Sequence, residues 1–245
     1  LKGTMDGEGT LAGIVGRVTD SNVTISNSKF DGRFEGDNCY GNGGFISWVD
    51  ATSSATINNC LFAPDRINTK TDNNETWARK DASGTVTVTN SHATRGMGSK
   101  FIAIRNADDW ATFHQMTEVS KGNYWIDAKL EADITTSLGI GVSEDTPWRG
   151  TFDGNGHTLN VNINRGDGKP CAVFCYVWHA NISNLHVTGK ISGGIHSAGL
   201  IGCRIGSPTI NIDRVWVSTE VTASSTHAAG VIGHVGAADV NMNDV

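Results

Sequence analysis

The sequence has no apolar stretch that approaches the roughly 18 residues of a membrane span, and it has no excess of basic charge. Lys and Arg number 19 against 25 Asp and Glu, and the formal net charge at pH 7 is -6. Nucleic acids and anionic membrane surfaces are bound through basic patches. These absences exclude a membrane-spanning helix and argue against nucleic-acid binding or membrane insertion.

Proline and charged residues are also scarce. Only 4 prolines occur in 245 residues, and charged residues make up 18%, below the roughly 25% of an average soluble domain. Glycine reaches 30 residues, which is about 12% of the chain against an average of about 7%. A hydrophobic fraction of 38% is too high for a disordered chain. This composition is typical of a turn-rich protein built from strands.

The sequence lacks the closely spaced cysteine pairs of a zinc site. Cys171 and Cys175 are nearest in sequence, and no second pair completes a tetrahedral set. We expect all the cysteines to be free thiols that pack as small apolar residues. Cys175 aligns with Gly202, beside Cys203, so these two cysteines are the one pair near bridging distance; alternating side-chain directions keep their sulfurs apart. The five cysteines are Cys39, Cys60, Cys171, Cys175 and Cys203.

A short box of small and aliphatic residues recurs along the chain. Copies begin at positions 12 and 43 and at positions 198 and 229, and each pair is separated by 31 residues. Ten to thirteen residues after each box, an aliphatic residue is followed by two polar residues. The boxes are Ala12-Gly13-Ile14-Val15-Gly16, Gly43-Gly44-Phe45-Ile46-Ser47, Ala198-Gly199-Leu200-Ile201-Gly202 and Ala229-Gly230-Val231-Ile232-Gly233. The second elements after these boxes are Ile25-Ser26-Asn27, Ile57-Asn58-Asn59, Ile212-Asp213-Arg214 and Met242-Asn243-Asp244. Ile182-Ser183-Asn184 follows a degenerate box, Ala172-Val173-Phe174-Cys175, and Val88-Thr89-Asn90 fits the pattern without a clear box before it.

The repeats alternate with period two, which predicts strands. Thr85-Val86-Thr87-Val88-Thr89 is one example. A unit of about thirty residues with so few apolar side chains buries no core alone and must stack on its neighbours. We therefore predict an all-β fold, a right-handed parallel β-helix with coils of about 30 residues. Residues expected to point inward as stacked ladders are Ile14, Ile46, Ile201, Ile232, Ile25, Ile57, Ile182, Ile212 and Met242.

One segment interrupts the repeats. Asn106 is a good helix N-cap, and Trp110, Phe113 and Met116 follow at three-residue spacing. This pattern predicts a short amphipathic helix over 106–119, with Lys121-Gly122 as its stop. A solenoid end exposes unpaired strands and an open apolar core, so we expect the aromatic side of this helix to cap one end.

The helix also predicts the domain organisation. Residues 1–99 are expected to form the last coils of a first β-helical unit. Residues 100–245 are expected to form the capping helix and the first coils of a second unit. This order predicts that the chain belongs to a longer tandem-repeat protein.

Several segments carry a family resemblance. These are the boxes at 198–202 and 229–233, the segment Trp148-Arg149-Gly150-Thr151-Phe152-Asp153-Gly154-Asn155-Gly156-His157-Thr158-Leu159, and Leu130-Glu131-Ala132-Asp133-Ile134 before it. They resemble bacterial surface proteins with the GLUG repeat, well over 100–245 and fairly over 1–62, whereas 63–99 match little. Such repeats occur in large secreted or wall-attached proteins, including adhesins and non-catalytic regions of some immunoglobulin A proteases. The resemblance implies a cell-surface parallel β-helix and no catalytic residues.

Parallel β-helices also include polysaccharide lyases and glycoside hydrolases, so paired carboxylates are candidates for catalysis. A hydrolase needs two of them about 5 to 9.5 Å apart, and Asp133 with Asp153 is the most suggestive pair. Asp153 lies in an Asp-Gly-Asn-Gly turn and Asp133 precedes an expected strand bend. We favour turn formation for both.

Two histidines are candidates for a metal site. His196 and His227 each lie three residues before a box glycine, so they should stack about 5 Å apart on adjacent coils. A structural site needs further ligands, and Thr10 and Gly41 occupy the equivalent positions in the first half. Cys203 and His234 are equivalent to each other, but Arg17 and Trp48 stand there in the first half. We therefore favour exposed corner histidines and expect no metal and no cofactor.

Tryptophans on the outside of the coils are the remaining candidates for ligand binding. An outward indole stacks on a sugar ring or anchors a protein partner; the alternative is that Trp216, between Val215 and Val217, packs into a coil. The candidates are Trp48, Trp77, Trp178 and Trp216.

We expect a non-enzymatic structural or adhesive module, secreted or on a bacterial cell surface, with carbohydrate or a host surface protein as partner. The alternative is a β-helical polysaccharide lyase or glycoside hydrolase acting on an extracellular polysaccharide.

Overall fold

Strands of successive repeats pair in parallel. The computed structural model describes residues 2–4, 9–118, 124–236 and 239–245. Strands make up 52% of the chain, which forms a parallel β-solenoid of about 7 turns, and these described residues include a single helix. Two units are distinguished, Leu1–Phe101 and Ile102–Val245, so the boundary lies two residues after the one expected from the sequence. The fold class predicted from the repeats is confirmed.

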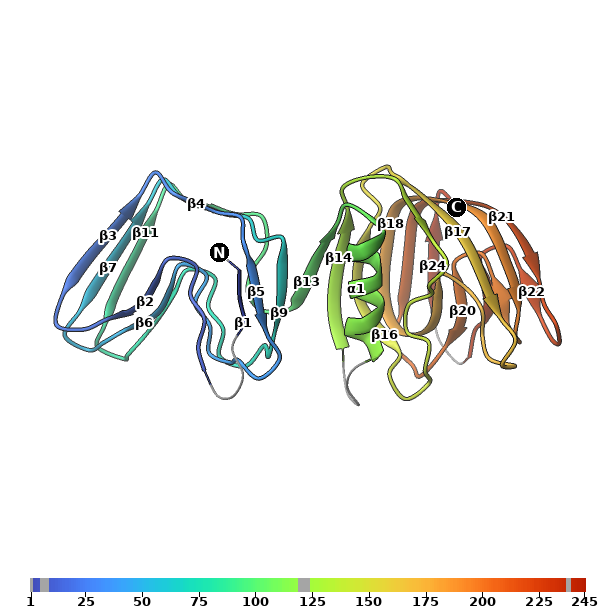
Figure 1. Cartoon of the computed structure of the whole chain (residues 1–245), viewed down its shortest axis with the longest axis horizontal. Coiled ribbons are helices and arrows are strands. Elements are labelled where there is room, and N and C mark those ends of the chain that lie inside the picture. Colours follow the sequence, from blue (N-terminus) through green and yellow to red (C-terminus); the bar gives the residue numbers. More distant parts are fainter. Residues whose placement is uncertain (1, 5–8, 119–123, 237–238) are drawn as a thin grey trace. The chain divides into compact units, whose positions relative to one another are not determined.

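The first unit stacks equivalent strands from three successive coils. Val15 pairs with Ile46, and Ile25 pairs with Ile57, as the repeat alignment predicts. The stacks are β2–β6–β10, β3–β7–β11 and β4–β8–β12, and β5 pairs with β1 and β9 (Figure 1). The strands are β1 (Lys2–Thr4), β2 (Val15–Val18), β3 (Asn22–Ser26), β4 (Lys29–Phe30), β5 (Arg33–Gly36), β6 (Ile46–Val49), β7 (Ser54–Asn58), β8 (Leu61–Phe62), β9 (Arg66–Thr69), β10 (Ala78–Lys80), β11 (Thr85–Thr89) and β12 (His92–Ala93). The unit boundary falls within β13 (Lys100–Ile104).

The second unit follows the same plan with longer strands. The 20-residue β18 pairs with β16 and β17 on one side and with β20 and β21 on the other. Ile201 pairs with Ile232, which confirms the alignment of the last two boxes. The strands are β14 (Tyr124–Leu130), β15 (Ile134–Thr136), β16 (Trp148–Asp153), β17 (Thr158–Arg165), β18 (Phe174–Gly193), β19 (Ser197–Ala198), β20 (Ile201–Arg204), β21 (Ile210–Thr222), β22 (Ala228–Ala229), β23 (Ile232–His234) and β24 (Val240–Asn243).

The second polar residue of each aliphatic-polar-polar element forms a corner of the coil. These corners have a left-handed backbone, which asparagine tolerates better than most residues. Side-chain amides also connect coils, because Asn59 Nδ2 donates to Asn27 Oδ1 at 2.7 Å. The corner residues, with φ from 49° to 54°, are Asn27, Asn59, Asn90, Asn184, Arg214 and Asp244.

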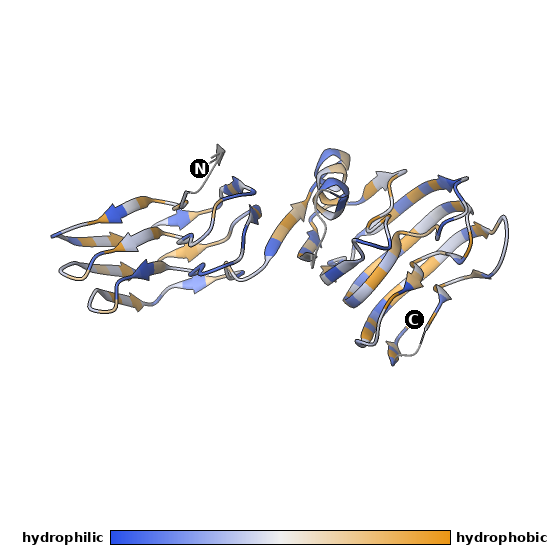
Figure 2. Ribbon diagram, turned by 90° about the horizontal axis from the view of Figure 1, so that it is seen from below, coloured by the Kyte–Doolittle hydropathy of each residue, from blue (hydrophilic) through white to orange (hydrophobic). Residues whose placement is uncertain are grey.

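Most of the predicted inward ladder is buried. Apolar and polar residues alternate along the strands, as the colour bands of Figure 2 show. Ile14 and Met242 contradict the prediction, with 45% and 55% of their surface exposed, and Ile232 is half-buried. Among the described strands, β24 pairs with β21 alone and β2 with β6 alone, so one side of each outer coil has no neighbour to cover it. The buried members are Ile25, Ile46, Ile57, Ile182, Ile201 and Ile212.

Helix α1 (Ala107–Glu118) confirms the helix predicted from the sequence. Its Asp109 main-chain N–H donates to Asn106 Oδ1 at 2.9 Å, which is the predicted N-cap. Trp110, Phe113 and Met116 are buried in the core of the second unit, so the helix packs its apolar side onto the coils. Residue 119 and the predicted stop at Lys121-Gly122 lie outside the described residues.

No helix among the described residues is long and apolar enough to cross a membrane. This agrees with the absence of a long apolar run in the sequence.

Candidate functional site

Trp216 is the most exposed tryptophan of the described residues, with 69% of its surface accessible. It lies in β21 between the buried Val215 and the inward Val217, so strand alternation turns its indole outward. The interpretation of Trp216 as a core residue is therefore wrong. Its ring stacks on His186 of the neighbouring coil, with centroids 4.9 Å apart and an interplanar angle of 30°.

A regular polar surface surrounds Trp216. Thr158 pairs with His186 and His186 pairs with Trp216, so the residues at every second position of three adjacent strands lie in rows. We call this surface the Trp216 face. Its residues are Thr158, Asn160 and Asn162 of β17, His186, Thr188 and Lys190 of β18, and Trp216, Ser218 and Glu220 of β21.

Hydrogen bonds between coils hold the side chains of the Trp216 face. His186 Nε2 lies 3.0 Å from Ser218 Oγ, which fixes the imidazole beneath the indole. Lys190 Nζ lies 2.9 Å from Glu220 Oε1. Glu220 is the single carboxylate of the face, and it is engaged in this ion pair. The face therefore combines one aromatic platform with hydroxyl, amide and imidazole groups at regular spacing.

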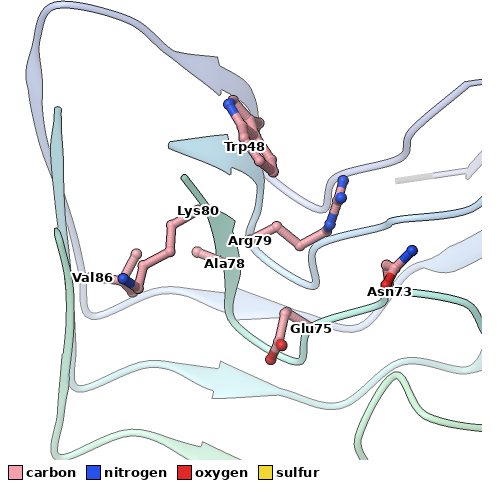
Figure 3. Close-up of a pocket in the computed structure, with 7 residues that line it drawn as sticks. All are labelled: Trp48, Asn73, Glu75, Ala78, Arg79, Lys80 and Val86. Atoms are coloured by element: carbon pink, nitrogen blue, oxygen red, sulfur yellow. The ribbon is translucent and has the colours of Figure 1, made fainter. Parts of the chain in front are cut away.

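Trp48 lies at a concave pocket of about 450 Å³ in the first unit. Figure 3 shows the Arg79 guanidinium beside the indole, while Lys80 extends toward Val86; Arg79 Cζ is 5.0 Å from the centroid of the Trp48 ring. Arg79 Nη1 also donates to the Gly41 carbonyl at 2.6 Å. The pocket is polar and charged, but Arg79 occupies the ring face that a sugar would need.

The other two predicted tryptophans are covered by protein. Trp77 packs on Phe45 and Phe62, with centroid distances of 5.4 and 6.5 Å. Trp178 lies under the Arg149 guanidinium, whose Cζ is 3.5 Å from the ring centroid. Both side chains are half-buried. We assign structural roles to both.

Asp133 and Asp153 accept hydrogen bonds from turn residues. Asp133 Oδ1 accepts from the Thr158 main-chain N–H at 2.8 Å and lies 3.2 Å from His157 Nδ1. These two contacts hold the pKa of Asp133 below its usual value. Asp153 Oδ1 accepts from the main-chain N–H of Asn155 at 2.9 Å. The Asp153 contact lies within its own turn, whereas the Asp133 contacts reach the next coil.

His196 and His227 stack on adjacent coils, as their spacing predicts, with ring centroids 4.9 Å apart. Their Nδ1 atoms are 2.9 Å apart. Burial, together with the neighbouring imidazoles of His234 and His227, lowers the pKa of His196. The lowered pKa favours the neutral form of the His196 ring.

No disulfide joins the five cysteines, all of which lie in the described part of the chain. Burial raises the pKa of the Cys171 thiol to about 11, and it also raises the pKa of the buried Cys175. Tyr176 pairs with Cys203, so Cys175 lies one position out of step with Cys203, as expected. Cys171 and Cys175 are therefore protonated at neutral pH and act as apolar side chains.

Two aromatic contacts on the outside of the second unit were not predicted from the sequence. Trp125 of β14, 43% exposed, stacks on His179 with centroids 5.2 Å apart. The half-buried His186 supports Trp216, and its 30-residue separation from Trp216 matches the repeat. That interval is the signal in the sequence that could have indicated the second contact.

Comparison with protein-family models finds no match for this chain, and comparisons with curated proteins and with solved structures find none either.

Proposed function

We propose that this chain is a non-enzymatic adhesive module of a secreted or cell-surface bacterial protein of the GLUG-repeat type, and that its Trp216 face binds carbohydrate. The exposure of Trp216 carries the proposal. Its indole is 69% exposed and so is available to a ligand, and a ligand that covers it gains about 25 cal/mol for each Å² of apolar area removed from water. Exposed aromatics with a polar rim are a common feature of binding sites.

The chemistry around Trp216 fits a sugar. The apolar side of a pyranose ring stacks on an indole, while its hydroxyls need nearby donors and acceptors. Ser218, Thr188 and Asn160 supply such groups in one row across three strands. Thr188 Oγ1 lies 3.3 Å from Asn160 Oδ1, so these groups are already oriented. A flat face of this kind suits an extended polysaccharide.

The same face is poorly equipped for hydrolysis. Glycoside hydrolysis needs two carboxyl groups about 5 to 9.5 Å apart. Glu220 is the one carboxylate on the Trp216 face, and Lys190 is its ion-pair partner. This arrangement favours binding over cleavage, and the lyase or hydrolase remains the alternative that the experiment must distinguish.

The exposed core side chains of the outer coils support a place in a tandem array. Ile14 and Met242 occupy aliphatic positions of the repeat, yet 45% and 55% of their surfaces are exposed. A further coil stacked on each would cover them. The proposal therefore includes neighbouring repeats on the same polypeptide.

Binding to immobilised polysaccharides and mucin glycans tests the proposal. The variant is Trp216→Ala, and the matched control is Trp125→Ala, which removes another exposed indole that stacks on an imidazole of the same unit. We expect the wild type and Trp125→Ala to bind the same glycans and Trp216→Ala to lose at least about tenfold in affinity, the scale of an aromatic hot spot. Equal binding by all three proteins, or binding to a protein ligand alone, would reject the carbohydrate face.

A further inference from the structure

Four side chains with metal-ligating atoms gather at one corner of the second unit. His196 and His227 precede the paired strands β19 and β22, in which Ser197 pairs with Ala228. Cys203 and His234 form a second pair across β20 and β23. Two adjacent coils thus contribute two side chains each. The sequence alignment identified each pair separately and gave no reason for the two pairs to meet.

The box glycines bring the two pairs together. A Cβ atom at Gly233 would collide with the carbonyl oxygen of His196, so glycine allows the His196 corner to lie directly against β23. The His196 ring consequently stacks on His234, with centroids 4.6 Å apart, as well as on His227. His196 and His227 themselves have left-handed backbones, with φ of 48° and 59°. These angles hold both imidazoles at the same corner.

The donor spacings are close to those around a tetrahedral metal ion. Zn–N bonds of about 2.0–2.1 Å place two nitrogens about 3.4 Å apart, and a Zn–S bond of about 2.3 Å places sulfur and nitrogen about 3.5 Å apart. Cys203 Sγ lies 3.6 Å from His234 Nδ1. His196 Nδ1 lies 2.9 Å from His227 Nδ1, slightly closer than two ligands of one ion.

In the structure, the donor atoms of the two pairs do not surround a common point. Among the described residues, no three His, Cys, Asp or Glu side chains are already placed to hold a metal ion. His227 and His234 are exposed and Cys203 and His196 are half-buried, so rotation of exposed imidazoles is not hindered by a packed core. Ring rotation by the exposed histidines is the adjustment that convergence requires.

We propose that His196, His227, His234 and Cys203 bind one divalent transition-metal ion of the zinc class. Imidazole nitrogen with one thiolate is a donor set that suits Zn²⁺. On binding, the Cys203 thiol releases its proton to solvent and the sulfur bonds to the metal. The ion links two successive coils, so its structural effect is to clamp the coil that contains β23 onto the coil that contains β20.

Metal binding by tag-free, reduced protein tests this site, with Zn²⁺ for affinity and Co²⁺ as the spectroscopic probe. His196→Asn and His227→Asn remove the imidazoles and keep a residue that tolerates a left-handed backbone. His186→Asn is the matched control, since it removes an imidazole of the same unit whose contacts are Ser218 and Trp216. Cys203→Ser removes the sulfur. Circular dichroism checks that each variant is folded.

We expect one Zn²⁺ per chain for the wild type and for His186→Asn, and a loss of at least about tenfold in affinity for His196→Asn and His227→Asn, because even changes behind a ligand cost 10–100-fold. The Co²⁺ complex should show a thiolate charge-transfer band that Cys203→Ser abolishes. No binding by the wild type, undiminished binding by the two histidine variants, or a Co²⁺ complex without the thiolate band would overturn the proposal.

Discussion

Asn59 donates a 2.7 Å hydrogen bond from Nδ2 to Oδ1 of Asn27, and both residues turn the chain through a left-handed corner with φ of 54° and 52°. The sequence interval between them is 32 residues, which is one coil. The same side chain therefore shapes its own coil and connects it to the next. Stacked asparagine amides are a recurring feature of in-register parallel strands.

The left-handed corner predicts which substitutions are tolerated at Asn59. Asn59→Gly keeps the left-handed backbone and should cost only the side-chain hydrogen bond, about 0.5–1.5 kcal/mol. Asn59→Val forces a β-branched residue into this conformation and should lower the free energy of unfolding by a further amount of about 1–3 kcal/mol. Urea unfolding followed by far-UV circular dichroism measures both. Equal stabilities for the two variants would show that the corner is not strained for ordinary residues.

The core register predicts a contrast between two isoleucines. Ile201 is fully buried and Ile14 is 45% exposed, although both lie in the repeated box. Ile201→Ala should lower the free energy of unfolding by about 2–5 kcal/mol, whereas Ile14→Ala should change it by about 0.5 kcal/mol. Chemical unfolding of the two variants provides the comparison. A large loss for Ile14→Ala would mean that Ile14 is covered in solution.

Asp133 predicts a pH dependence of stability. Its pKa is depressed below 3.8 in the folded chain by the Thr158 N–H and His157, so the unfolded chain takes up the proton more readily. The ionised carboxylate therefore stabilises the fold above about pH 4, and this contribution is lost as the pH falls through the folded pKa. Asp133→Asn should be less stable than the wild type at pH 7, with a gap that narrows toward pH 3. Thermal unfolding across this range measures the gap, and a constant gap would contradict the assignment.

The burial of the cysteines predicts which thiol reacts first in the folded protein and how many react after unfolding. Four are buried, and Cys203 is half-buried, so an alkylating reagent with a chelator present should label Cys203 first in the folded protein. Unfolded, unreduced protein should show five reactive thiols. A count of three would reveal one disulfide, which we would assign to Cys175 and Cys203.

The repeats in the sequence predict the fold well because each box and each polar pair recurs at the coil length. The repeat alignment places Ile57 beside Ile25 and Ile232 beside Ile201, and the strand pairings agree. The burial predicted for Ile14 and Met242 is wrong for two reasons. Val15, and not Ile14, pairs with Ile46, and both residues lie in outer coils, where burial depends on a neighbouring coil that a repeat alignment does not specify.

The candidate sites were less predictable from sequence. Trp216 was a candidate, but its neighbours Val215 and Val217 allowed either direction until the strand register was known. The contact of His196 with His234 crosses from a corner to a strand, so no repeat interval indicates it. The covering of Trp48 by Arg79 was not predictable from the sequence either, because the position of a guanidinium group depends on side-chain conformation.

Binding of a polysaccharide through the Trp216 face, without cleavage, is the proposed activity of this chain. The most direct measurement incubates the protein with each polysaccharide that it retains and determines both the bound fraction and the polymer length by size-exclusion chromatography. We predict that retention depends on Trp216, that the length distribution of the polymer is unchanged, and that no new reducing or unsaturated ends form. Shortened polymer produced by the wild type would contradict it and establish a β-helical enzyme.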